Sequence, residues 1–433
     1  MSAAVVIPQA SRALPAWREP AAWSKRADLV AVLIAVSLPW STSLVGIFGA
    51  VLVVVIAPTL DFRLFLRSLK RPISALPIAL FVLALVGTLW SDAPWGARSY
   101  ALSPATKLLV LPLLFYHFER STRGMWVFVG FLGSCTLLLV LSYGVAFDSR
   151  LALKADAYYG VPVKNYIDQS QEFGLCAVSL TYPIVTFVRQ RKFALAAVLA
   201  LLALSFLANL AFVVTSRTAL IAIPVMFLTY VLLHLRWQGR IVTLCILAVL
   251  FSTAWFASPR LQERIASVFS QYDQYKEFKQ ATSVGLRLEF WRKSLGFFAE
   301  APLIGHGTGA TRRLFEQAAI GQIGAAAEVI GNPHNQTLNV AIQWGALGVL
   351  VLYMMWLVHL LIFRGDDLAN WVGLLVVVQN IVSSLFNSHL FDFHEGWIYV
   401  LGVGVAGGMM LAQRVSHQSP GPAGSASVSR SQP

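Results

Sequence analysis

Apolar residues in this sequence are gathered into long stretches that few charged residues interrupt. A helix that crosses a bilayer needs about 20 such residues in a row, and the sequence contains twelve stretches of this kind, of which the first two are short and closely joined. The pattern predicts an all-α polytopic membrane protein with about twelve transmembrane helices. The predicted spans are residues 27–41, 43–59, 72–90, 100–117, 125–147, 171–188, 193–212, 218–235, 241–257, 335–363, 368–387 and 397–413.

The composition agrees with this pattern. Of the 433 residues, 57% are hydrophobic and only 12% are charged, whereas soluble domains carry about 25% charged residues. A soluble enzyme, a disordered scaffold and a secreted disulfide-rich protein are therefore excluded. The net charge of +13 does not predict a nucleic-acid partner, because the basic residues lie between the apolar runs. We expect them to set the topology and to contact membrane lipids.

The distribution of Lys and Arg predicts the orientation. In a twelve-span arrangement, 18 basic residues fall on the side that holds both termini, and 6 fall on the other side outside the one long loop. The positive-inside rule then places both termini in the cytoplasm. The expected segments are a cytoplasmic N-terminal part (1–26), nine spans (27–257), a large outer loop (258–334), three spans (335–413) and a disordered cytoplasmic tail (414–433).

The long loop at 258–334 contains two stretches with helical spacing of apolar residues. We expect two amphipathic helices that lie on the outer membrane surface or over a cavity. A small soluble cap without a catalytic part is the alternative. The spacing is carried by Leu261, Ile265, Val268 and Tyr272, and then by Val284, Leu288, Trp291, Leu295 and Phe298.

His334 is the first candidate for chemistry, in the stretch Asn332-Pro333-His334-Asn335 where the long loop enters the tenth span. Asn suits a helix N-cap and Pro the first helical position, so we expect His334 in the first turn of a helix. A helix N-terminus disfavours the imidazolium and attracts anions. A neutral imidazole beside a bound phosphate would suit a general base. The alternative is that His334 caps its helix or hydrogen-bonds to the loop.

Three basic residues lie where a charge is costly, namely Arg217, Arg287 and Lys107. Ionisable residues in membrane segments usually face a cavity or a partner, and guanidinium groups bind phosphate oxygens in pairs of hydrogen bonds. These residues are candidates for holding a diphosphate without a metal. The alternatives are snorkelling of Lys107 to the interface and ion pairs of Arg287 with Glu289 or of Arg217 with Asp392.

A glycine-rich turn at 302–309 contains Gly305, His306 and Gly307. No strand precedes it and no P-loop lysine follows, so it is a weak nucleotide motif. We expect a flexible turn whose amides approach a ligand, with His306 in a structural role.

A second polar group lies between the last two spans, on the same side as His334. The residue types would allow a metal, but the spacing determines no ligand geometry. We predict no metal, and expect Asp392 to orient an arginine or a histidine or to be an ordinary polar loop residue. The group consists of His389, Asp392, His394 and Glu395.

The motif that begins at His334 resembles that of the O-antigen ligase family, within the wider O-antigen ligase and polymerase superfamily. The family pattern is His-Asn, nine residues, Gly, two residues and a small residue, and here it falls on His334, Asn335, Gly345 and Gly348. Further similarities are the glycine-rich turn at 302–309, Arg287 upstream of it, Arg217 in Ser-Arg-Thr and Asp392 in the last outer loop.

This resemblance implies a fold similar to the lipid-dependent GT-C-type glycosyltransferases and an inverting glycosyl transfer without a cofactor. The implied donor is a glycan on undecaprenyl diphosphate, and the implied acceptor is a sugar hydroxyl of the lipid A core. His334 would be the general base and Arg217 and Arg287 the diphosphate ligands, with Lys107 as a weaker candidate. Asn335, Asp392, Gly305 and Gly307 would support the site. An O-antigen polymerase, a protein O-oligosaccharyltransferase and, from another class, a twelve-helix secondary transporter are the alternatives.

Overall fold

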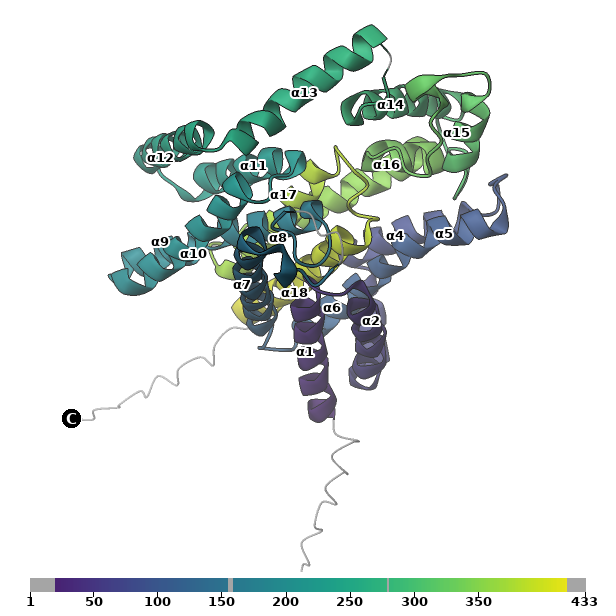
Figure 1. The fold of residues 1–433 in the computed structure, drawn as a ribbon. Helices are drawn as coiled ribbons and strands as arrows, with labels where there is room; N and C mark the ends of the chain where they lie inside the picture. The colour runs from purple at the N-terminus through teal and green to yellow at the C-terminus, as the bar shows by residue number, and fades with distance from the viewer. Residues whose placement is uncertain (1–19, 155–158, 279, 419–433) are drawn as a thin grey trace, which may run out of the picture.

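The computed structural model describes residues 20–154, 159–278 and 280–418, and in these ranges it is built from helices without a strand (Figure 1). The all-α fold class is therefore confirmed. The first twelve helices are α1 (Pro20–Ser37), α2 (Thr42–Ile56), α3 (Phe62–Leu69), α4 (Pro72–Val86), α5 (Trp95–Thr106), α6 (Val110–Phe118), α7 (Met125–Phe147), α8 (Tyr166–Ser179), α9 (Thr181–Arg189), α10 (Phe193–Phe212), α11 (Arg217–His234) and α12 (Trp237–Ala257).

The long loop and the C-terminal part supply six more helices. They are α13 (Pro259–Phe278), α14 (Ser283–Glu300), α15 (Thr311–Ala319), α16 (Gln336–Ile362), α17 (Leu368–Ser383) and α18 (Phe393–Gln418). Short 3-10 helices lie at Ala57–Thr59 (η1), Lys107–Leu109 (η2), Ser149–Leu151 (η3) and Gly324–Ala327 (η4).

All twelve predicted spans fall on helices, and most of these helices have the length and composition of a membrane span. Among the described residues, nine helical segments meet both conditions, and α3 with α4 makes a tenth if this pair, bent by 78°, is one broken span. The other two predicted spans differ: α1 carries Lys25, Arg26 and Asp28 in its first half, and α17 has only 16 residues. The polytopic membrane architecture is confirmed.

The two chain ends depart from the predicted segments. Helix α1 begins at Pro20, inside the predicted N-terminal part, and α18 continues to Gln418, beyond the predicted start of the tail at residue 414. The remainder of both predicted segments, 1–19 and 419–433, lies outside the described residues.

Helix α18 forms the centre of the bundle, with most of its length buried against α6 and α17. Small residues allow the close approach: a Cβ on Gly407 would lie 2.4 Å from Cε1 of Phe115, and one on Gly408 would lie 2.5 Å from Cβ of Phe118. Small residues at helix interfaces let membrane helices pack closely, where no hydrophobic driving force holds them together. This packing fixes the start of α18, which carries the polar residues of the last loop.

The long loop forms α13, α14 and α15, which lie at the end of the bundle opposite to the start of α1 (Figure 1). Both predicted amphipathic helices are present, as α13 and α14. The predicted apolar stripe of α14 is not its buried face, because Leu295 is 58% exposed while Phe290 and Phe297 are buried. Phe315 of α15 and Ile342 of α16 complete the small core under α14.

A break in α16 at Gly345 receives the glycine-rich turn. Gly345 has φ +61° and ψ −158°, which interrupts the helical hydrogen bonds. The turn replaces them, since the amides of His306 and Gly307 donate to the carbonyls of Ile342 (2.8 Å) and Gln343 (2.9 Å), while the Ala346 amide donates to the Pro302 carbonyl (2.8 Å). The turn is therefore a fixed part of the bundle, and the expectation of a flexible turn with free amides is wrong.

Substitution of Gly345 should destabilise the protein more than substitution of an ordinary helical glycine. Its backbone conformation is essentially restricted to glycine, at a cost of about 1–3 kcal/mol for another residue, and a Cβ would lie 2.4 Å from the Leu303 carbonyl carbon. We predict that Gly345→Ala lowers the thermal midpoint in detergent. Gly46→Ala, on α2 where a Cβ meets nothing within 4 Å, should leave it unchanged. Equal midpoints for the two variants would contradict the account of the break.

Candidate functional site

A cleft of about 140 Å³ opens between four helices and is lined by arginines. Tyr166 comes from α8, Arg217 from the start of α11, Arg264 and Gln271 from α13, and Arg287 from α14. We call it the arginine cleft. The structure thus brings together two residues that the sequence predicts, Arg217 and Arg287, and adds Arg264.

Among the residues that the structure describes, the positive charge in the arginine cleft has no acidic partner. Arg217 donates to the side-chain oxygens of Gln271 (3.0 Å) and Ser267 (2.8 Å), and the Arg264 guanidinium lies 5.1 Å from the centroid of the Tyr166 ring. No carboxylate lines the cleft, and the Nε atoms of Arg217 and Arg264 are buried without a hydrogen bond in the part of the chain described. Burial lowers the pKa of Arg287 from its usual value.

This arrangement favours an anion as the occupant. Guanidinium groups that are partly removed from water repel one another, which costs free energy. A phosphate group that accepts hydrogen bonds from several of them offsets this repulsion. The two expected ion pairs are wrong. Arg217 bonds to Gln271 and Ser267 rather than to Asp392, and Glu289 pairs with Arg292 (2.5 Å) rather than with Arg287.

His334 lies before α16 and not in its first turn. Its φ is +53°, the left-handed region, and its amide donates to Oδ1 of Asn332 (3.0 Å). The N-cap of α16 is Asn335, whose Oδ1 accepts from the Leu338 amide at 3.0 Å. The predicted placement, with Asn332 as the cap, is therefore wrong by three residues. A non-glycine residue in this conformation is uncommon and, where tertiary contacts hold it, is often functional.

The His334 ring lies between α14 and the loop that follows α17. Its Nδ1 lies 2.8 Å from Oδ1 of Asn387, and the Phe290 ring is tilted against it at 6.2 Å. Burial lowers the pKa of His334, and the positive charge of Arg287 acts in the same direction. Arg287 and Phe290 are three residues apart and so lie on the same side of α14. One helix therefore joins the ring to the arginine cleft and keeps the imidazole neutral at pH 7.

Asp392 continues this chain of contacts. Asn387 Nδ2 donates to Asp392 Oδ2 at 2.6 Å. Burial raises the pKa of Asp392 to about 6, against the opposing effects of Lys107 and of the hydrogen bond from Asn387. Asp392 is therefore linked to His334 through the amide of Asn387, and its role in orienting a histidine stays a prediction.

Lys107 does not reach the arginine cleft. It is buried in η2, and its Nζ donates to the backbone carbonyls of Phe391 (3.2 Å) and Asp392. Both earlier interpretations, as a diphosphate ligand and as a snorkelling residue, are therefore wrong. Lys107 holds the last loop against the bundle.

Gly305 and Gly307 do not line the arginine cleft either. The Gly305 amide donates to the Ala301 carbonyl at 3.1 Å, and the Gly307 amide is bound to α16. His306 has a structural role, as predicted, because its Nε2 lies 2.8 Å from the Phe297 carbonyl oxygen. These glycines support the fold around the site and offer no amide to a ligand.

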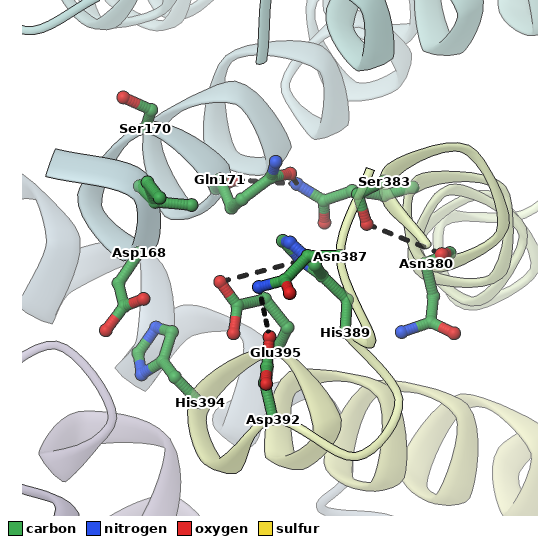
Figure 2. A network of polar contacts seen from close by, with 12 residues as sticks. Asp168, Ser170, Gln171, Asn380, Ser383, Asn387, His389, Asp392, His394 and Glu395 are labelled. Carbon is green, nitrogen blue, oxygen red and sulfur yellow. Dashed lines mark hydrogen bonds and ion pairs between the residues drawn. The ribbon is translucent and has the colours of Figure 1, made fainter. Parts of the chain in front are cut away.

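A buried polar cluster lies behind Asn387, where Figure 2 shows Asp392 and Glu395 at the start of α18 beside His389. One donor atom from each of His389, Asp392 and Glu395 lies within 4.8 Å of the others. These residue types would suit a divalent ion, and burial lowers the pKa of His389 to about 4, which keeps its imidazole neutral. The absence of a metal stays a prediction. Asp392 accepts a hydrogen bond from Asn387, so the cluster also supports the loop.

A second layer of this cluster ties the loop to α8. His394 lies between Lys164, with Nδ1 to Nζ at 2.8 Å, and Glu172, with Nε2 to Oε1 at 2.8 Å. All three groups are removed from water wholly or in part. Because buried charges are retained only with partners, the start of α18 has little freedom to move.

Sequence reasoning missed Arg264 and Asn387. A signal for Arg264 exists, because Arg260, Arg264, Ser267 and Gln271 repeat at helical spacing and form a polar stripe beside the apolar one on α13. Asn387 has no such signal, since it is an ordinary loop asparagine until the fold brings it to His334.

A comparison with known families gives a match for part of the chain. Residues 199–353 match the family model described as O-antigen ligase. This match places the segment in the O-antigen ligase superfamily. It begins within α10 and ends within α16, and so includes Arg217, Arg264, Arg287, His334 and Gly345. A comparison with curated proteins gave no match. The match supports the resemblance that the histidine motif predicts, and it extends over residues 199–353 of the polytopic membrane protein.

The arginine cleft should bind inorganic pyrophosphate without a metal. A hydrogen bond to a charged group contributes about 1.5–3 kcal/mol, so we predict that Arg264→Gln weakens binding about tenfold or more. The measurement is isothermal titration of the detergent-solubilised protein in chelator-treated buffer. Arg312→Gln, on the exposed surface of α15, is the matched control and should bind as the unaltered protein does. The same affinity in both variants would remove Arg264 from the site.

Proposed function

We propose that this protein is an O-antigen ligase, which transfers a glycan from undecaprenyl diphosphate to a sugar hydroxyl of the lipid A core. It would act at the periplasmic face of the inner membrane of a Gram-negative bacterium, with both termini in the cytoplasm. The observation that carries the proposal is the arginine cleft beside a neutral His334, the two joined by α14.

The arginine cleft would hold the diphosphate of the donor. Arg217, Arg264 and Arg287 supply three guanidinium groups from three helices, and negative charge grows on the diphosphate as the glycosidic bond breaks. Fixed cations that stabilise this charge lower the barrier. In this proposal they take the place of the divalent ion that many glycosyltransferases use.

His334 would act on the acceptor. Its neutral imidazole takes the proton of the acceptor hydroxyl while that oxygen attacks the anomeric carbon from the side opposite the diphosphate. The bond between the anomeric carbon and the phosphate oxygen breaks, and undecaprenyl diphosphate leaves. The configuration at the anomeric carbon is inverted, and the step needs no nucleotide.

The position of the site suits two lipid-anchored substrates. The arginine cleft lies between the membrane helices α8 and α11 and the loop helices α13 and α14. A headgroup can dock there while its chain stays in the bilayer. The exposed apolar side of α14, including Leu295, would face the lipid.

The role of His334 is tested by comparing two histidines of the same loop. We predict that His334→Gln lowers the transfer rate of the purified protein on the order of 10²–10⁴-fold, the usual contribution of a general base, and leaves pyrophosphate binding intact. In a ligase-null strain it should remove the lipopolysaccharide ladder. His306→Gln, which can keep the contact to the Phe297 carbonyl, should restore the ladder. A normal ladder from His334→Gln at normal abundance would end its catalytic role.

The acceptor is identified by supplying three candidates in parallel. With undecaprenyl diphosphate-linked glycan as donor, we expect transfer to lipid A core, and none to a second lipid-linked repeat or to a pilin-like protein. Transfer only to the repeat would identify a polymerase, and transfer only to the pilin-like protein would identify a protein O-oligosaccharyltransferase. Donor flux into proteoliposomes without glycosyl transfer would identify a transporter.

The pH dependence of transfer should reflect the lowered pKa of His334. Burial and then Arg287 keep this pKa below the usual 6.5, and the base must be neutral to act. We predict that the fall of kcat/KM for the donor at acidic pH has its midpoint below pH 6.5. Arg287→Gln removes a repelling charge, so in any residual activity the acidic limb should move to higher pH. A limb above pH 7 in the unaltered protein would contradict the environment described for His334.

A further inference from the structure

We infer that Asn387, held by Asp392, is a positioning residue that fixes the tautomer of His334, with hydrogen on Nδ1 and the lone pair on Nε2. The inference rests on the proposed function, because it concerns the base of that reaction. It assigns a role to a residue that neither the sequence motif nor the family match identifies, since residue 387 lies beyond 199–353.

The first step is the orientation of the Asn387 amide. Its two ends contact different groups: one lies 2.8 Å from His334 Nδ1 and the other 2.6 Å from Asp392 Oδ2. An ionised carboxylate only accepts hydrogen bonds, so the NH₂ group must face Asp392. The reverse orientation would place the amide oxygen against the carboxylate oxygen, two acceptors in contact in a half-buried site. The carboxylate therefore determines which end of the amide His334 meets.

The second step follows from the first. The end that faces His334 is the amide oxygen, which accepts and cannot donate. A hydrogen bond with Nδ1 then requires hydrogen on Nδ1. In the neutral imidazole only one ring nitrogen carries hydrogen, so the lone pair is on Nε2. No hydrogen bond involves Nε2 within the residues that the structure describes, which leaves this nitrogen available to an acceptor hydroxyl.

The loop that carries Asn387 is fixed on both sides of the histidine. Asn335 Nδ2 donates to the Leu385 carbonyl (3.0 Å), and the Gln336 amide donates to the Ser384 carbonyl (2.9 Å). Ser388 Oγ donates to Asn332 Oδ1 (2.7 Å), the same oxygen that receives the His334 amide. The amide and the ring are therefore held in one hydrogen-bonded frame, and no large movement of the loop is needed to align them.

Asp392 is fixed in turn by its surroundings. The Asp392 amide donates to the Ser388 carbonyl at 2.8 Å, and the Asp392 carbonyl accepts from Lys107 Nζ. Lys107 is buried and reaches this loop from η2. This explains a buried lysine that does not contact the arginine cleft: it secures the residue that orients the amide.

The test compares Asn387→Leu, which has a similar volume and no side-chain hydrogen bond, with Ser384→Ala. Ser384 is a buried residue at the start of the same loop, and its Oγ makes no hydrogen bond in the part of the chain that the structure describes. We expect kcat of the purified Asn387→Leu protein to fall on the order of 10²-fold, in the range of general-base effects, with KM for the undecaprenyl diphosphate-linked donor unchanged. Ser384→Ala should retain kcat. The kcat of Asp392→Asn should lie between those of these two variants, because an amide at position 392 can accept or donate and so does not determine the orientation of the Asn387 amide.

A second measurement on the unaltered protein does not depend on the folding of a variant. In ¹⁵N-histidine-labelled protein, solid-state NMR reports which ring nitrogen carries hydrogen, and the His334 signals are those missing from His334→Gln. We expect a protonated Nδ1 and a bare Nε2 at pH 7.5. Hydrogen on Nε2 would overturn the inference.

The outcomes separate this inference from the proposed function. If Asn387→Leu keeps its kcat, or raises KM for the donor instead, while His334→Gln is inactive, the positioning role is wrong and the general base stands. If His334→Gln itself transfers at the normal rate, the proposed function fails, and the kinetic argument for Asn387 fails with it.

Discussion

Positive charge without an acidic partner is the constraint on which the site depends. Arg217, Arg264 and Arg287 line one cleft at the edge of the bundle, and no carboxylate from residues 20–154, 159–278 or 280–418 lines it. Packing elsewhere in the bundle offsets the free-energy cost of holding three guanidinium groups together, and a bound polyanion would remove this repulsion. The same charge acts on the neighbouring imidazole, because Arg287 adds to the effect of burial in lowering the pKa of His334. A single helix, α14, thus joins the arginine cleft to His334.

Close packing behind the site holds the segments that carry its residues. The glycine-rich turn is hydrogen-bonded into the break of α16 at Gly345, and α18 is buried against α6 and α17. Both features fix chain segments that carry site residues: the start of α16 follows His334, and the start of α18 follows Asp392. The loop between α17 and α18 joins them. The positions of His334 and Asp392 therefore depend on contacts deep in the bundle, as the proposed catalysis would require.

The fold class follows from sequence because membrane helices have a strong local signal. About 20 apolar residues in succession are sufficient to place a span, and all twelve predicted spans fall on helices. Arg217, Arg287 and His334 could be singled out because charge and histidine are unusual in such surroundings. The errors have a different origin. The residue types of Lys107, Gly305 and Gly307 suit a ligand, but Lys107 and Gly307 bond to distant parts of the chain and the Gly305 amide bonds to the Ala301 carbonyl. Asn387 could not be found, because its role depends on a contact with a residue 53 positions away.

The most direct measurement is a structure of the protein with undecaprenyl diphosphate bound. A second cleft, at the ends of α11 and α16, is lined by His234, Arg364 and Trp371. The headgroup could therefore bind at either of two positions, which the structure would distinguish. The account predicts diphosphate oxygens in contact with the side chains of Arg217, Arg264 and Arg287, and Nε2 of His334 facing the space where the donor sugar would lie. Density for the diphosphate at the second cleft, with the three arginines unoccupied, would contradict it.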